Sequence, residues 1–312
     1  MQWLVLIAVA LITGLGTEAP NRPIPAFSWR RAVPAAAALD SRSDDLVASF
    51  NHQWHTVYGG VGINTDAYSI PIYTVAANTA TTQVTISHGC TADPGLMSQL
   101  RAVPIPSDAQ PAKGGDHALV ISQPSIDTEW ELWQAQRDAG GNWSACWGGR
   151  LERASRSNGV FPRPYGLSAS GLSYLASTIR VSELQARSIN HALAVSIVAT
   201  TAGVQVPPAN RNDGNSTGSN AIPEGTRFRL DPTVNVTRLG LPPAGVTIAK
   251  ALQSYGMVVM DTSGAVVLSA EDSQPYVAAG RGDPYASLFG STPSYKILAK
   301  IPWNRLQALS PP

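Results

Sequence analysis

The feature that most constrains this chain is a series of short apolar runs, each rich in Val, Ile, Thr or Tyr and each followed by Gly, Pro, Asn or Asp. This pattern is typical of β-strands separated by turns. The runs lie at 68–76, 82–87, 117–122, 128–135, 191–199, 227–232, 255–262 and 264–270. The stretch from Met257 to Leu268 predicts a hairpin, because Asp261, Ser263 and Gly264 supply turn residues between two apolar segments.

Helical patterns are fewer. Pro243 to Tyr255 carries apolar residues at helical spacing, and Gly256 stands where a C-terminal cap is expected. A second short helix is predicted from Ser182, as N-cap, to Arg187. The segment 207–225 has almost nothing to bury and predicts an exposed loop. We therefore expect a mainly β fold: a two-layer, jelly-roll-like β-sandwich with one or two peripheral helices.

The N-terminal residues predict export. An apolar run from Trp3 to about Gly16 has the length of a signal-peptide core and is shorter than the roughly 20 residues of a membrane span. No Lys or Arg precedes the run, and cleavage after Ala19 would leave Pro20 first. We expect a signal peptide at 1–19, a Pro- and Ala-rich segment at 20–43 and a single domain at 44–312. The mature protein would be secreted, extracellular or periplasmic.

Composition narrows the partners. The formal net charge of +1 gives no electrostatic reason to expect nucleic acid or an anionic membrane surface. A charged fraction of only 14%, with 27 Gly and 24 Pro, fits a turn-rich extracellular protein. Cys90 and Cys146 either form one disulfide or remain two thiols, and two cysteines cannot build a structural zinc cluster. We expect a monomer without a metal or cofactor.

The stretch 128–133, TEWELW, carries the most chemistry. Because side chains alternate along a strand, Trp130 and Leu132 face one side, and Glu129, Glu131 and Trp133 face the other. A carboxyl pair beside an indole suits a glycosidase, whose carboxyls stand about 5–5.5 Å or about 6.5–9.5 Å apart. The alternative is an exposed strand face with two solvated glutamates.

Two histidines enter similar strands, in DHALVIS at His117 and NHALAVS at His191. Each is either a hydrogen-bonded core or strand-entry histidine, or an acid/base partner of a nearby carboxylate. The strand expected to return beside TEWELW contains Trp143 and Trp147. The clustered tryptophans form either a sugar-stacking surface or a Trp-rich core.

Six blocks occur in a fixed order: HALV, WELW, SACWGGR, ASGL, HALAVSI and GTRFRL. In these blocks, across about residues 50–305, the chain resembles a group of secreted bacterial β-sandwich proteins that has no assigned reaction. It is only distantly similar to jelly-roll polysaccharide lyases and glycosidases, whose Arg-x-Glu-x-Arg, Gln-Ile-His and Glu-x-Asp-x-x-Glu motifs are missing from the sequence. The resemblance implies particular importance for Glu131, His117 and His191.

The sequence thus predicts a secreted carbohydrate-active enzyme that cleaves a polysaccharide or oligosaccharide, as a glycoside hydrolase or a lyase. Glu131 is the principal catalytic candidate. The other predicted catalytic residues are Glu129, His117 and His191, and the predicted substrate contacts are Trp133, Trp147, Asp116 and Arg150. The alternative is a non-catalytic carbohydrate-binding or cell-surface β-sandwich module.

Overall fold

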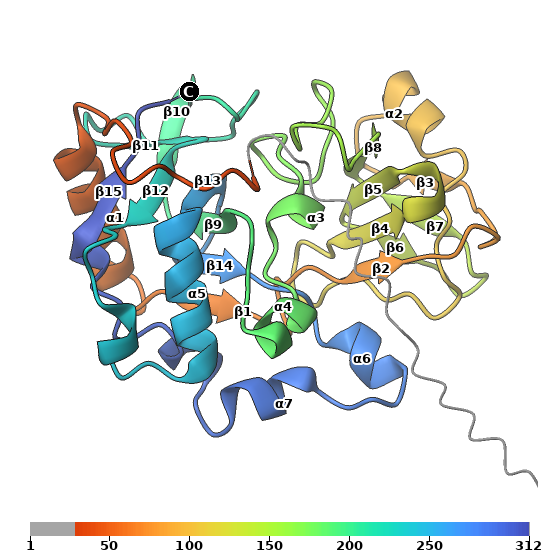
Figure 1. Ribbon diagram of the computed structural model, residues 1–312. Helices are drawn as coiled ribbons and strands as arrows, with labels where there is room; N and C mark the ends of the chain where they lie inside the picture. The colour runs from red at the N-terminus through yellow and green to blue at the C-terminus, as the bar shows by residue number, and fades with distance from the viewer. Residues whose placement is uncertain (1–28, 312) are drawn as a thin grey trace, which may run out of the picture.

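The computed structural model describes residues 29–311, so the signal peptide predicted at 1–19 lies outside the described residues. Within this range the chain forms fifteen strands, and each of the eight predicted runs contributes one of them. The prediction of a mainly β chain is confirmed. Figure 1 shows two groups of strands side by side, with the short helix α3 (Tyr174–Ser177) between them.

The larger group is a six-stranded sheet in the order β1-β14-β9-β13-β12-β15. Its strands are β1 (Gly62–Asn64), β9 (Leu193–Ile197), β12 (Arg227–Leu230), β13 (Met257–Thr262), β14 (Val267–Ser269) and β15 (Leu306–Ala308). The hairpin predicted at 257–268 is wrong, because β13 and β14 both pair with β9, which lies between them. Every residue of β9 is buried, and a buried strand needs partners on both of its edges.

One face of this sheet packs against α1 (Ser43–Thr56) and α5 (Pro243–Ser254) in a large apolar cluster. The helix predicted from Pro243 is confirmed. Gly256 follows it with φ +75°, a conformation that glycine adopts without strain, so the cap was placed correctly. The second predicted helix is α4 (Val181–Ala186), but its N-cap is Arg180 and Ser182 lies inside the first turn. The Glu183 carboxylate accepts the Arg180 N–H there, at 2.9 Å.

The smaller group contains a four-stranded sheet in the order β2-β4-β5-β8. Its strands are β2 (Ile72–Thr74), β4 (Leu119–Gln123), β5 (Thr128–Trp133) and β8 (Trp147–Glu152). One face packs in an apolar cluster with α2 (Pro94–Gln99), and the other meets α3 and the inner strands of the large sheet. The sheet is thus buried on both faces, which explains its near-continuous apolar sequences.

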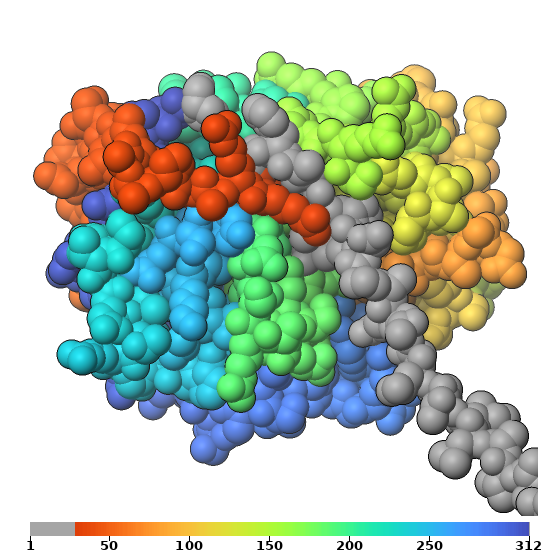
Figure 2. All heavy atoms as spheres, in the orientation of Figure 1, coloured from red at the N-terminus to blue at the C-terminus, as the bar shows by residue number. Residues whose placement is uncertain are grey.

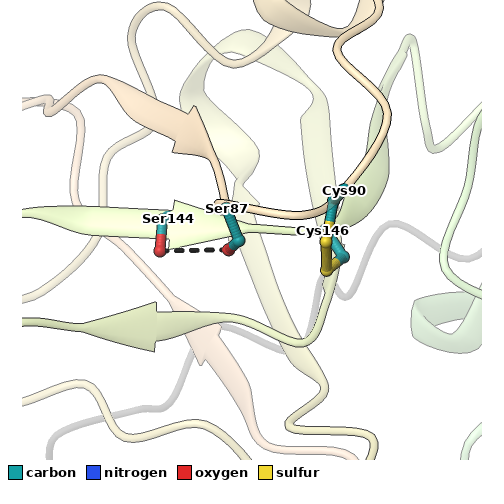
Figure 3. The surroundings of a disulfide bond; sticks show 4 residues. All are labelled: Ser87, Cys90, Ser144 and Cys146. Atoms are coloured by element: carbon teal, nitrogen blue, oxygen red, sulfur yellow. Dashed lines mark hydrogen bonds between the residues drawn. A yellow bond between two sulfur atoms is a disulfide. The ribbon is translucent and has the colours of Figure 1, made fainter.

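A disulfide stabilises the outer edge of this group. Cys90 and Cys146 are bonded, with their Cα atoms 5.3 Å apart, so the open alternative between disulfide and thiols is settled in favour of the bond. It links the loop after β3 (Val84–Ile86) to the junction between β7 (Trp143–Ala145) and β8. Nearby, the hydroxyls of Ser87 and Ser144 share a hydrogen bond of 3.2 Å (Figure 3).

The remaining strands show how mixed the architecture is. The strands β3, β7 and β6 (Gln136–Arg137) form a three-stranded sheet, and β10 (Thr200–Gln205) pairs with β11 (Ile222–Glu224) in parallel. Five of the eleven strand pairings in residues 29–311 are parallel. A jelly roll is built from antiparallel strands, so the sheet order does not establish the predicted jelly-roll-like sandwich. In the described range, no helix is long and apolar enough to cross a membrane.

Candidate functional site

The residues of TEWELW occupy β5, in the middle of the smaller group. Trp130 and Leu132 lie in the apolar cluster on one face, as strand alternation predicts. Glu129 and Glu131 lie on the opposite face but are completely buried, with 0% exposure. The alternative of a solvated glutamate face is therefore wrong, because α3 and the large sheet cover this side of β5. A substrate in solution does not reach either carboxyl in this conformation.

Glu131 is bonded to the start of α3. Its Oε1 atom accepts the main-chain N–H groups of Tyr174 at 2.7 Å and Leu175 at 3.1 Å, which have no partners within the helix. Ser173 caps the same turn by accepting the Ala176 N–H. Burial raises the pKa of Glu131 to about 8, and the main-chain hydrogen bonds oppose that shift. Glu131 is thus a largely neutral carboxyl that joins β5 to α3 at neutral pH.

The two histidines lie in different surroundings. His191 is fully buried at the entry to β9, where Nδ1 contacts the Ala192 carbonyl at 2.8 Å and Nε2 lies 3.0 Å from a Glu183 oxygen. The Nε2 contact with Glu183 therefore links α4 to the start of β9, and Nδ1 is occupied by the neighbouring carbonyl. His117 is half-buried before β4, and its carbonyl accepts the N–H of Ala135, just after β5, at 3.0 Å. Glu131 is not among these partners of the two histidines.

The predicted substrate contacts divide into two sets. Trp133 is half-buried at the end of β5, and its indole N–H points to the exposed Asp116 carboxylate at 3.5 Å. Trp147, opposite Trp133 on β8, stacks on Tyr165 with ring centroids 6.0 Å apart. Arg150 forms an ion pair with Glu152 at 2.8 Å, near the surface. Trp133 and Asp116 are thus the pair that stands beside further titratable groups.

Those further groups centre on Asp261, near the end of β13. The pairing of β13 with β9 shifts register between Val259 and Asp261, so Met260 is an extra residue in a β-bulge. The bulge places Asp261 opposite Ser196, on the side of β9 that faces α3. Bulges re-aim side chains in this way and are common beside active sites. Asp261 also lies where the parallel strands β9 and β13 end, the edge at which ligands bind in open sheets.

Asp261 is half-buried and held by defined partners. Its Oδ2 atom accepts the Ala169 N–H at 3.0 Å and lies 3.4 Å from the Tyr174 hydroxyl, and Oδ1 accepts the Thr262 N–H at 2.9 Å. The pKa of Asp261 is raised to about 7, mainly by desolvation and in part by the charges of Asp213 and Asp116. Such a carboxyl exchanges a proton near neutral pH, as an acid/base catalyst must.

Two more carboxyls complete the group, which we name the Asp261 cluster: Asp116, Tyr174, Arg211, Asp213, Glu224 and Asp261. Glu224, at the end of β11, is fully buried and accepts the Thr200 hydroxyl at 3.2 Å. Burial first, then the charge of Asp261 and a hydrogen bond with Asp213, raise the pKa of Glu224 to about 9. Asp213 is exposed and lies 3.4 Å from the Thr262 hydroxyl. With a pKa of about 9, Glu224 is protonated at neutral pH.

Arg211 provides the positive charge of the cluster. Its Nη2 atom donates to the main-chain carbonyls of Gly166 at 2.9 Å and Ser168 at 2.5 Å. Burial lowers its pKa, and the charges of Asp261, Glu224 and Asp213 oppose that shift. Within the described part of the chain, its buried Nε atom has no hydrogen-bond acceptor. The cluster thus retains one donor for a bound molecule or a water.

Of the residues predicted from sequence, the structure brings Asp116 and Trp133 to the Asp261 cluster, and it connects Glu131 to the cluster through Tyr174. The partners described above for His117, Trp147 and Arg150 all lie outside the cluster. The sequence-based prediction did not include Asp261, because VVMDTSG was interpreted as a hairpin turn. It also did not include Asp213 and Glu224, because the segment 207–225 was expected to be an exposed loop. The available signal was an acidic residue that directly follows a buried apolar run.

Comparison with known proteins gives no family for this chain: no family model, no curated protein and no solved structure matches it. In residues 29–311, no three His, Cys, Asp or Glu side chains are grouped so that they could hold a metal ion. The site is therefore interpreted from its own geometry.

Proposed function

We propose that the chain is a secreted glycan-cleaving hydrolase whose acid/base groups belong to the Asp261 cluster. The observation that carries this proposal is Asp261 itself: a half-buried carboxyl with a pKa of about 7, turned by a bulge to the end of two parallel strands beside a second, exposed carboxyl, Asp213. The catalytic role predicted for Glu131 passes to Asp261, because Glu131 is enclosed.

Asp261 would act as the general acid. Its protonated carboxyl donates the proton to the glycosidic oxygen while the bond from that oxygen to the anomeric carbon breaks. The N–H groups of Ala169 and Thr262 and the Tyr174 hydroxyl hold the carboxyl in position and stabilise the carboxylate that remains. Positioned proton transfer of this kind accelerates a reaction by about 10²–10⁴-fold.

Asp213 would act as the base. Its carboxylate removes a proton from the water that attacks the anomeric carbon, so the products are a hemiacetal and an alcohol. Glu224 remains protonated at neutral pH and directs its hydrogen bond to Asp213, which makes it a positioning residue. After turnover Asp261 is ionised and Asp213 is protonated, and exchange with solvent restores both.

Glu131 would contribute indirectly. It binds the two N–H groups that begin α3, and the first residue of α3 is Tyr174, whose hydroxyl faces Asp261. A shift of α3 would therefore change the hydrogen bonding and the pKa of the proposed acid. This gives the WELW block a role in the site without substrate contact.

The glycan assignment rests on the surroundings of the cluster. Trp133 supplies a partly exposed indole beside Asp116, and aromatic planes next to carboxylates suit the apolar faces and hydroxyls of a sugar. The acidic cluster favours a neutral or cationic glycan over an anionic one. Export agrees with the disulfide between Cys90 and Cys146, because such bonds persist in oxidising compartments.

The direct test is a screen of soluble neutral and amino-sugar polysaccharides for new reducing ends, with the wild type and Asp261→Asn. We expect the variant to lose at least about 100-fold in kcat while its circular dichroism and melting temperature stay close to wild type. Asp45→Asn, at an exposed position in the first turn of α1, is the matched control and should retain full activity. Full activity of Asp261→Asn on a substrate that wild type cleaves would refute the assignment.

The second candidate is a non-catalytic glycan-binding module. It is favoured by the burial of Glu129 and Glu131, which removes the carboxyl pair nearest to Trp133 from contact with solvent. A wild-type protein that binds a glycan through Trp133, and releases no product over a broad pH range, would support the module and reject the hydrolase.

A further inference from the structure

A separate cavity lies beneath the N-terminal segment of the described chain. Figure 2 shows this segment, drawn in red, running across the face of the molecule from α1. It is held by the carbonyls of Pro34 and Ala35, which accept hydrogen bonds from Arg229. The cavity has a volume of about 190 Å³, and the C-terminal residues near Leu309 and the loop at Pro207 and Pro208 form its other walls.

The donors that line this cavity have few acceptors. Trp29 is 1% exposed, and its buried indole N–H has no hydrogen-bond partner among residues 29–311. Arg227 uses Nε and Nη2 for the carbonyls of Tyr255 and Arg31, and it forms no ion pair with any carboxylate in residues 29–311. Burial lowers the pKa of Arg227 to about 10, so its guanidinium remains charged at neutral pH.

The charges around the cavity are mainly positive. Arg31 and Arg42 add two exposed guanidinium groups, and Asp40 is the single carboxylate among the described lining residues. The Oδ1 atom of Asp40 accepts the main-chain N–H of Arg42 at 2.8 Å, so this carboxylate is already engaged. A buried indole N–H without an acceptor and a surplus of positive charge favour a bound anion.

We propose that this cavity binds a small carboxylate with a compact apolar body, with the carboxylate at Arg227 and the Trp29 indole N–H and the apolar body against Val258, Pro223 and Leu309. A charged guanidinium pairs with a carboxylate through strong hydrogen bonds, and the desolvation that Arg227 already bears is offset when the anion binds.

The volume limits the occupant. An apolar cavity of about 150 Å³ holds benzene, so 190 Å³ accommodates a single ring or a short branched acyl chain with its carboxylate. A polysaccharide or a long acyl chain does not fit. The site lies on β11, β12 and the N-terminal segment, and none of its lining residues belongs to the Asp261 cluster, so it is independent of the proposed hydrolase reaction.

Binding is tested by calorimetry and by the indole N–H signals in proton–nitrogen NMR, with phenylacetate as the probe. The neutral phenylacetamide and the cation 2-phenylethylamine are probes of matched shape. We expect phenylacetate to bind at millimolar affinity or tighter and to shift the signal that Trp29→Phe removes, and we expect the amine not to bind. Arg227→Gln should weaken binding at least about tenfold, and Trp29→Phe should weaken it by a smaller factor.

Arg238→Gln, at an exposed position outside the cavity, is the control and should bind as wild type does. Each variant is checked by its melting temperature, and the wild-type titration remains decisive if Arg227→Gln does not fold. No binding of phenylacetate to wild type, or equal binding of the amine, overturns the proposal. Asp261→Asn should bind phenylacetate as wild type does, which would show that this site is independent of the proposed hydrolase reaction.

Discussion

Replacement of Glu131 by Gln gives the sharpest test of how the buried carboxyl behaves. The pKa of Glu131 is about 8 in the folded protein, compared with 4.5 for a free glutamate side chain. Between these values the folded state holds a proton that the unfolded state has released. The stability that Glu131 contributes is therefore full below about pH 4.5 and is lost as the pH rises toward 8.

The magnitude follows from this linkage. One proton of difference changes the free energy of unfolding by about 1.4 kcal/mol per pH unit, so wild type should lose about 3 kcal/mol through Glu131 between about pH 5 and about pH 7.5. Gln cannot ionise, and its carbonyl oxygen still accepts the N–H groups of Tyr174 and Leu175. We expect Glu131→Gln to be within about 1 kcal/mol of wild type at pH 5 and more stable than wild type at pH 7.5.

The assay is urea unfolding followed by circular dichroism at both pH values. Glu131 does not shift the pKa of Asp261 or Glu224, so these two carboxyls contribute equally to both proteins and cancel in the difference between wild type and variant. Glu152→Gln, at an exposed position of the neighbouring strand β8, is the control and should leave the pH dependence unchanged. A stability difference between wild type and Glu131→Gln that is the same at pH 5 and pH 7.5 would show that Glu131 does not change protonation on folding.

The remaining predictions concern the proposed acid/base group, the disulfide and the glycine that caps α5. If Asp261 is the acid, kcat/KM on a responsive glycan falls as the pH rises through about 7. Asp116→Asn removes a charge that raises the pKa of Asp261, so this fall in kcat/KM should begin at a lower pH in the variant. An unchanged pH profile would reject the influence of Asp116 on Asp261. Replacing Cys90 and Cys146 by Ser opens a loop of 56 residues and should cost about 4 kcal/mol in the free energy of unfolding, measured in urea. Gly256→Ala should cost about 2 kcal/mol in the same measurement, because φ is +75° and the new Cβ would lie 2.3 Å from the Phe228 carbonyl oxygen; a variant as stable as wild type would contradict that reasoning.

The strands were predictable because their signal is local. Alternation in TEWELW placed Trp130 and Leu132 in the core correctly, and the spacing after Pro243 located α5 together with its glycine cap. Pairing is not local. The turn residues after Met260 are compatible with a hairpin, but the insertion of β9 between β13 and β14 depends on the burial of both edges of β9. The stretch 257–268 alone does not indicate that β9 pairs with both of these strands and prevents them from pairing with each other.

The site was less predictable than the strands for the same reason. Alternation identifies the face on which Glu131 lies, but the cover over that face comes from α3, more than forty residues later in the chain. Asp261 was hidden by its bulge, since regular alternation would place it with Val259 against the apolar cluster under α5. The sequence of 207–225 predicted only an exposed loop, but Ile222–Glu224 forms the buried strand β11 and Asp213 stays on the loop before it. Loops of this kind carry binding residues in many folds.

The bulge at Met260 divides β13 into two segments with opposite phase. Up to Val259 the alternation serves the packing of two apolar clusters, and from Asp261 onward the orientation of the side chains is set independently of that packing. A change of residue type at position 261 therefore alters the chemistry of the strand end without a compensating change in the core, whereas the insertion of one residue between Met260 and Asp261 would reverse the direction of the acidic side chain. The proposed reaction therefore depends on the number of residues before Asp261 in this strand as well as on the residue type at position 261.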